Sequence, residues 1–147
     1  MKTLLFFLVV ILLPALGHAQ NFEYGKPAEL KGLTRAYIDV GVDIKSFEEI
    51  KKIIQNAKLS QLTIVDSIKE SDFVLMFRGG KEAVLVDGDS DLQKSGKGVV
   101  AIPSASGDRL RILISFESLQ NRIGEAKPST KFAKEFVKAY KEANRLK

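Results

Sequence analysis

Two groups of carboxylates are the side chains in this 147-residue chain whose types and spacing suggest chemistry. Asp39 and Asp43 bracket the end of a predicted strand, where two facing acids could hydrolyse a glycosidic bond. The segment Asp87–Asp91 has the alternating acids that open a calcium-binding loop. An EF-hand loop also needs glycine at its sixth position and glutamate at its twelfth, where this chain has Leu92 and Gly98. We therefore interpret the segment as a solvated turn and predict no metal site.

The usual catalytic nucleophiles and bases are scarce. The chain has no Cys, and its single His, His18, falls in a segment that we expect to be removed. Without these residue types, Ser-His-Asp catalysis, Cys-His catalysis and zinc sites of Cys and His are excluded. The segment 95–98 (Ser-Gly-Lys-Gly) lacks the earlier Gly and the following Ser or Thr of a phosphate-binding loop. Ser104 and Ser106 have no identifiable base, so we assign no catalytic, cofactor-binding or metal-ligating residue and expect no cofactor.

The amino terminus has the layout of a secretory signal peptide in residues 1–19. Lys2 gives a positive start, Leu4–Leu16 is an apolar run, and Gly17 and Ala19 are the small residues before a cleavage site. The run is shorter than the ~20 apolar residues of a membrane span, and an uncleaved anchor is the alternative. No Cys follows the site, so we expect no lipid anchor. The sequence predicts an exported chain, periplasmic or secreted, that is soluble after cleavage.

The first half of the remaining chain predicts the order strand, helix, strand, strand. β-Branched and aromatic residues mark the strands, and apolar residues repeating at three and four mark one face of the helix. We expect these elements at 34–40, 47–58, 62–66 and 73–77. Ser46 and Glu49 have the spacing of a capping box at the start of the helix. Residues 20–33 predict an extended lead-in.

The second half predicts antiparallel strands joined by turns, at 82–87, 99–102 and 110–116. Gly79 and Gly80 predict a turn, and the polar segments 87–98 and 104–108 predict loops. The strand at 99–102, which Pro103 ends, is our candidate for an uncovered sheet edge. Such an edge could accept a partner strand through main-chain hydrogen bonds.

The last predicted helix begins near Ser129 or Thr130, either of which could serve as its N-cap. Its apolar stripe predicts that the helix belongs to the core. This stripe consists of Phe132, Ala133, Phe136, Val137, Tyr140 and Ala143. Lysines lie off the stripe, either as a patch for an anionic surface or as a solvated face with i,i+4 pairs such as Lys131–Glu135. We favour the solvated face.

Two amphipathic helices and about six strands predict an α/β (α+β) fold. We expect a two-layer sandwich, in which a mixed sheet of about five to six strands carries the two main helices on one face. The predicted organisation is a signal peptide at 1–19, a lead-in at 20–33 and a single α/β domain at 34–147.

Three segments of this chain carry a resemblance to known exported domains. Ala36–Val40, Leu62–Ser67 and Glu70–Leu75, with a helix after the first, resemble a group of exported bacterial domains. The group includes the amino-terminal domain of TolB, curli-secretion-type lipoproteins and uncharacterised families. The resemblance covers about 34–77 and implies this fold and a place in the cell envelope. It carries over no catalytic residue, and the chain departs from the lipoprotein members because no Cys follows its signal.

Charge and composition narrow the function classes further. The formal charge is +5, and the basic residues are scattered among acids, so we expect no specific nucleic-acid binding. We predict an exported, non-catalytic binding or assembly module of the cell envelope, whose partner is a protein or another envelope component. The alternative is a small carboxylate-dependent hydrolase of envelope glycans, so whether the chain is an enzyme stays open. The sequence does not identify the ligand or the oligomeric state.

Overall fold

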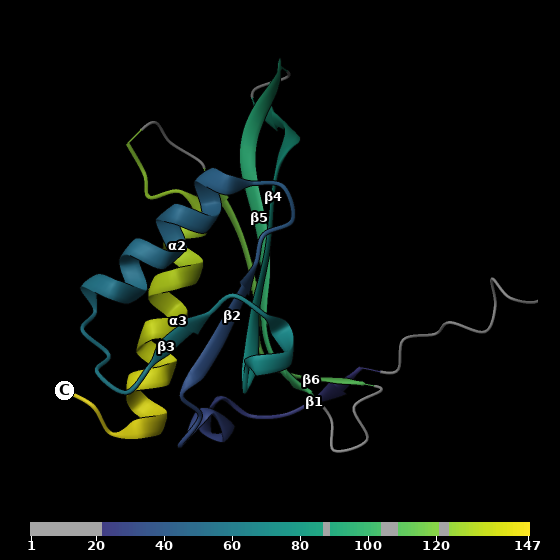
Figure 1. Ribbon diagram of the computed structural model, residues 1–147. Coiled ribbons are helices and arrows are strands. Elements are labelled where there is room, and N and C mark those ends of the chain that lie inside the picture. The colour runs from purple at the N-terminus through teal and green to yellow at the C-terminus, as the bar shows by residue number, and fades with distance from the viewer. Residues whose placement is uncertain (1–21, 87–88, 104–108, 121–123) are drawn as a thin grey trace, which may run out of the picture.

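The computed structural model describes residues 22–86, 89–103, 109–120 and 124–147. They form a mixed six-stranded sheet in the order β1-β6-β5-β4-β2-β3, and both long helices lie on one side of it (Figure 1). This confirms the predicted α+β sandwich. The elements are β1 (Glu23–Tyr24), the 3₁₀ helix η1 (Pro27–Leu30), β2 (Arg35–Asp39), α2 (Ile44–Asn56), β3 (Thr63–Val65), the 3₁₀ helix η2 (Ile68–Glu70), β4 (Phe73–Val86), β5 (Asp89–Pro103), β6 (Leu110–Gln120) and α3 (Pro128–Asn144).

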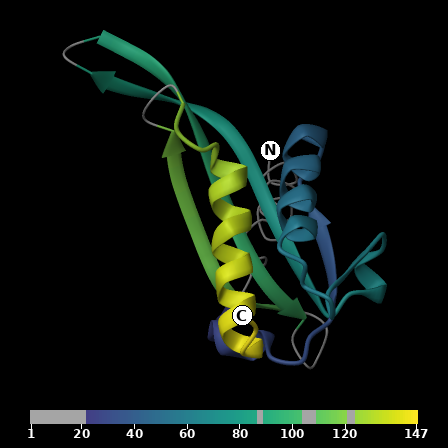
Figure 2. The same cartoon turned by 90° about the vertical axis from the view of Figure 1, so that its left-hand side faces the viewer.

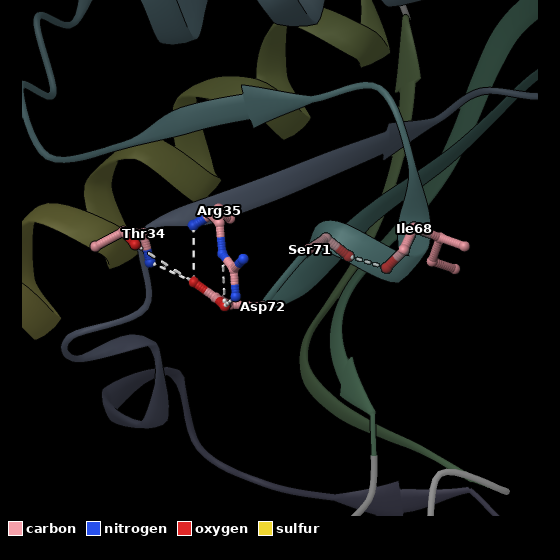
Figure 3. Close-up of polar contacts among 5 residues, drawn as sticks. All are labelled: Thr34, Arg35, Ile68, Ser71 and Asp72. Atoms are coloured by element: carbon pink, nitrogen blue, oxygen red, sulfur yellow. Dashed lines mark hydrogen bonds and ion pairs between the residues drawn. The ribbon is translucent and has the colours of Figure 1, made fainter.

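The Asp72 carboxylate connects two strands in the parallel part of the sheet. β2 pairs in parallel with both β3 and β4. Asp72, directly before β4, accepts hydrogen bonds at 2.9 Å from the backbone N–H groups of Thr34 and Arg35, which begin β2. The Arg35 guanidinium donates to the other Asp72 oxygen at 2.8 Å, and Figure 3 shows how these groups converge. One side chain thus fixes where two neighbouring strands start.

The hairpin of β4 and β5 is much longer than the sequence predicts. The strands stay paired from Val74↔Ala101 to Val86↔Asp89 and project beyond the helices (Figure 2). The turn expected at Gly79 and Gly80 and the loop expected over 87–98 are therefore wrong, except that 87–88 lies outside the described residues. Glycine has a weak intrinsic strand preference, but a continuous ladder of main-chain hydrogen bonds overrides that local preference here.

Two glycines of β5 let α3 lie directly against the sheet. A Cβ atom at Gly96 would overlap Pro128, the first residue of α3, and one at Gly98 would lie 2.6 Å from the Phe132 ring. The Phe132 ring instead stacks on Phe77 of β4, with ring centroids 5.6 Å apart. Gly96 and Gly98, which belong to the segment expected to be a loop, are therefore the positions at which the helix contacts the strand.

The core is built around the aromatic side of α3, as its apolar stripe predicts. Phe132, Phe136 and Tyr140 are fully buried, and Phe136 and Tyr140 both contact the Phe73 ring of β4. The Tyr140 hydroxyl donates a hydrogen bond of 2.6 Å to the Leu33 carbonyl, which satisfies its one buried polar atom. The same helix therefore anchors the segment before β2 as well as the sheet.

Residues 22–33 take part in the domain. β1 pairs in parallel with β6, and Leu30 of η1 is fully buried in the core. The Asn144 side chain accepts a hydrogen bond from the Gly32 N–H and donates to the Leu30 carbonyl. The amino-terminal part of the described chain is thereby bound to the end of α3.

Both long helices begin before the positions that the sequence predicts. Asp43 caps α2, because its carboxylate accepts hydrogen bonds from the Ser46 N–H at 3.1 Å and the Ser46 hydroxyl at 2.6 Å. Ser46 therefore lies inside the helix, and the expected Ser46–Glu49 capping box is wrong. α3 begins at Pro128 with Lys127 as its N-cap residue, because proline suits the first helical position. Among the described residues, no helix is long and apolar enough to cross a membrane.

Candidate functional site

Asp39 and Asp43, which bracket the end of β2, bind different partners. Asp39 is bound to Arg78 of β4, whose Nη2 lies 3.1 Å from Asp39 Oδ2, while its other oxygen accepts a hydrogen bond from the Gly41 N–H. Burial opposes ionisation of Asp39, but these hydrogen bonds outweigh it and lower its pKa. Hydrogen bonds from Ser46 lower the pKa of Asp43 in its capping role. Each aspartate therefore has its own structural partner.

Three further carboxylates connect elements in the same way. The Arg111 guanidinium donates to Glu29, and this hydrogen bond lowers the Glu29 pKa. The hydrogen bond from Arg35 lowers the Asp72 pKa. A general acid at neutral pH needs a raised carboxyl pKa, so the lowered pKa values of Glu29 and Asp72 point away from that role.

Glu49 is the third of these carboxylates and lies between the helices. It accepts hydrogen bonds from the Lys127 ammonium group and the Ser129 hydroxyl at the start of α3. Burial opposes its ionisation, but the bonds from Lys127 and Ser129 prevail and lower its pKa. An ionised Glu49 therefore joins α2 to the amino-terminal end of α3.

The remaining sequence candidates that the structure describes belong to β5. Asp89 and Asp91 belong to β5, where they pair with Val86 and Val84, while Asp87 lies outside the described residues. The segment 95–98 is also part of β5. Ser104 and Ser106 lie outside the described residues. In the described ranges, no three His, Asp or Glu side chains gather closely enough to hold a metal ion.

The sheet edges differ from the one that the sequence predicts. Residues 99–102 belong to β5, which lies between β4 and β6, so the expected free edge is wrong. β3 instead forms one edge of the sheet. At the other side, β1 covers β6 only at Arg111 and Ile112. Strand order depends on contacts between distant segments, which a local pattern of glycine and proline does not report.

A groove of about 550 Å³ lies beside the β3 edge and the carboxyl-terminal end of α2. We call it the β3–α2 groove. Its apolar lining combines Ile54 and Leu59, which are buried, with the partly buried Leu62 and Ile64. Lys51 and Lys58 lie on its helix side. The rest of the lining is polar and consists of Gln55, Ser60, Thr63 and Asp66. The groove is therefore partly apolar, with two lysines and one carboxylate among its charged groups.

The backbone of β3 is oriented for pairing on this side. The Thr63 N–H donates a hydrogen bond of 2.7 Å to the Thr34 carbonyl, so Thr63 faces β2. In a parallel strand the N–H and C=O of one residue point the same way, and successive residues alternate. The N–H and C=O of Ile64 therefore point away from β2, toward the open edge of the sheet.

Comparisons with known proteins give distant structural likenesses. No protein-family model matches the chain, and no curated protein matches it. A PelC dodecamer from Paraburkholderia phytofirmans is 8% identical, with a TM-score of 0.45, over 78% of this chain and 90% of that chain. A minor lipoprotein from Acinetobacter baumannii is 7% identical, with a TM-score of 0.41, over 76% and 93%.

A protein from Xanthomonas campestris, assigned to the DUF330 family, is 11% identical, with a TM-score of 0.38, over 75% of this chain and 78% of that chain. Likenesses this distant carry no argument about function. They do not confirm the finer resemblance to TolB and curli-secretion domains, which stays a prediction.

Proposed function

We propose that this protein is an exported binding or assembly module of the cell envelope, which works without catalysis by capturing an extended segment of a partner polypeptide. The segment would lie in the β3–α2 groove and add a strand to β3. The observation that carries the proposal is the outward-facing main chain of Ile64 beside a partly apolar groove. The signal-peptide layout of residues 1–19 supports export.

Strand addition suits the chemistry of this groove. Main-chain hydrogen bonds to Ile64 would supply affinity that does not depend on the partner's side chains. Alternate side chains of an extended segment point to opposite sides, so every second one would contact the apolar lining around Ile54 and Leu59. Lys51 and Lys58 outnumber the single acid of the groove, Asp66, so they favour acidic side chains in the partner, because complementary charge selects partners and speeds association.

The absence of catalysis is supported by the roles of the carboxylates. Hydrogen bonds to Asp39, Asp43 and Glu49 lower their pKa values and hold them as ions in contacts between elements. A carboxylate used in this way is a poor proton donor near neutral pH. Binding at a sheet edge needs no titrating group.

A peptide-binding assay tests the proposal with a defined probe. A fluorescein-labelled decapeptide alternating valine and glutamate is added to residues 20–147, beside a matched peptide with lysine in place of glutamate. We expect fluorescence anisotropy to rise with the acidic peptide and much less with the basic one. Equal binding of the two peptides would show that the groove lysines do not select the partner.

Two variants locate the binding. Ile64→Pro removes the outward N–H and should abolish binding, whereas Ile64→Val keeps the N–H and should not. Lys58→Glu should weaken binding of the acidic peptide, whereas Lys52→Glu, on the same helix but outside the groove, should not. Thermal melting shows whether the proline variant remains folded. Undiminished binding by both Ile64→Pro and Lys58→Glu would rule out this groove.

A further inference from the structure

A second hollow lies at the opposite end of α2, where four lysines gather. It has a volume of about 420 Å³ and lies between the first turns of α2 and α3 and the β4–β5 hairpin. We call it the lysine cleft, after Lys45, Lys81, Lys94 and Lys127, which all line it. It shares no residue with the β3–α2 groove.

The carboxylates in the lysine cleft already have partners. Glu49 binds Lys127 and Ser129, and Asp43 binds the N–H and hydroxyl of Ser46. Four lysines and two carboxylates leave a formal charge of +2 in the cleft. The two acids thus satisfy the helix ends and one lysine, and they leave the positive charge of the hairpin side uncompensated.

Lys81 and Lys94 carry most of this uncompensated charge. They are directly opposite each other in the β4–β5 ladder, where two like charges repel. Within the described part of the chain, neither is in an ion pair with a carboxylate. Lys45 faces the same hollow from α2. An anion bound between the lysines would reduce the repulsion between their charges.

The hairpin side of the lysine cleft gives an anion access to the main chain. Gly79 and Gly80 line the hollow and are exposed, although the Asp43 carboxylate lies close to Gly79, at 3.5 Å from the place that a Cβ atom would take. The Ser95 hydroxyl, beside Gly80, adds a hydrogen-bond donor to the lining. The site therefore offers ammonium groups and a hydroxyl beside an exposed part of the strand.

We propose that the lysine cleft binds a phosphate group. A phosphate monoester carries about −1.5 to −2 charges at neutral pH, which matches the uncompensated +2 better than a single carboxylate does. Lysine binds phosphate as a flexible point charge, so the three lysines Lys45, Lys81 and Lys94 that line the hollow need no rigid geometry. The phosphate could belong to a free ion or to a lipid headgroup, and both present the same charged oxygens to the cleft.

Calorimetric titration with inorganic phosphate tests the site on residues 20–147. The experiment compares the wild type with Lys81→Gln/Lys94→Gln and with the control Lys134→Gln/Lys138→Gln, which removes the same charge from the exposed face of α3. We expect the cleft variant to bind phosphate about tenfold more weakly or worse, and the control to bind like the wild type. Equal binding by all three proteins would overturn the proposal.

Two further arms separate the sources of phosphate and the effect of salt. Vesicles of phosphatidylcholine with phosphatidic acid present the group on a surface, and vesicles of phosphatidylcholine alone are their control. Binding to the former that is stronger than binding to free phosphate, and lost in the cleft variant, would assign the site to a lipid headgroup. In the second arm, the melting temperature is measured with phosphate and with sodium chloride at equal ionic strength. If sodium chloride raises the melting temperature as much as phosphate does, the effect is only charge screening, and the proposal is overturned.

Discussion

Different interactions stabilise the two ends of the sheet. At the end where β2, β4 and α3 meet, buried aromatic rings fill the core, and polar atoms such as the Tyr140 hydroxyl are satisfied. At the hairpin end, α2 and α3 begin beside exposed strands, and charged contacts such as Glu49–Lys127 connect them. Aromatic packing stabilises the first end, which we call the aromatic end, whereas the hairpin end contains like charges that repel and lower its stability.

This difference also separates the two candidate binding regions. The β3–α2 groove lies at the carboxyl-terminal end of α2, where apolar side chains line it. The lysine cleft lies at the amino-terminal end of the same helix, where charge dominates the lining. The helix α2 thus contributes to a partly apolar groove at one end and to a charged cleft at the other.

The largest expected effect comes from the aromatic end. Phe136 is fully buried against Phe73 and Tyr140, so Phe136→Ala should lower the free energy of unfolding by about 3–5 kcal/mol. Lys138→Ala, an exposed change on the same helix, should have almost no effect. Denaturant unfolding measures both. Similar small losses in the two variants would mean that α3 does not anchor the core.

The second effect lies at the boundary between the two ends. Gly98→Ala would place a Cβ atom 2.6 Å from the Phe132 ring, and we expect a loss of about 1–3 kcal/mol from overpacking. Gly80→Ala is the matched control in the same hairpin, because its Cβ would meet only the Ser95 hydroxyl, at 3.2 Å. If Gly98→Ala were as stable as Gly80→Ala, the close contact between α3 and β5 would be wrong.

The third effect tests how the hairpin end is held. Glu49→Gln removes the ionised partner of Lys127 and Ser129, and we expect a loss of about 1–2 kcal/mol at neutral pH. The Glu49 pKa is lowered in the folded protein, so its contribution is full above its ordinary value of 4.5. The contribution disappears as the pH falls through the folded pKa.

A pH series distinguishes this charged contact from simple packing. The stability difference between the wild type and Glu49→Gln should be largest near neutral pH and should shrink as the pH falls below about 4.5. Chemical denaturation at several pH values measures it. A difference that stays constant down to strongly acidic pH would show that Glu49 does not act through its charge.

The aromatic end could be predicted from sequence, whereas the hairpin end could not. The stripe with Phe132 and Phe136 identifies the buried face of α3, because helical periodicity is a local signal. Gly79 and Gly80 indicate a turn by the same local logic, and yet they lie in a strand, because β5 pairs with them along its length. The predicted cap at Ser46 is wrong because Asp43, three residues earlier, caps the helix, and aspartate is as good an N-cap residue as serine.

The candidate binding regions also depended on pairing that local patterns do not encode. The edge position of β3 follows from the strand order, which the sequence does not show. The local pattern of glycine and proline indicated residues 99–102 as an edge, and these residues lie in the central strand β5. The opposition of Lys81 and Lys94 follows from the hairpin register. A register that pairs Val86 with Asp89 also pairs Lys81 with Lys94, whereas a turn at Gly79 separates the two lysines.

The smallest expected effect has the opposite sign and sharpens the comparison most. Lys94→Gln removes one of two like charges that face each other across the hairpin, so it should raise the free energy of unfolding by about 0.2–1 kcal/mol in low salt. The gain should fall as salt is added, because salt screens exposed charges. Lys134→Gln, on the exposed face of α3, is the matched control. Thermal unfolding at two ionic strengths measures both variants, and a loss of stability in Lys94→Gln would mean that this lysine stabilises the free protein instead of straining it.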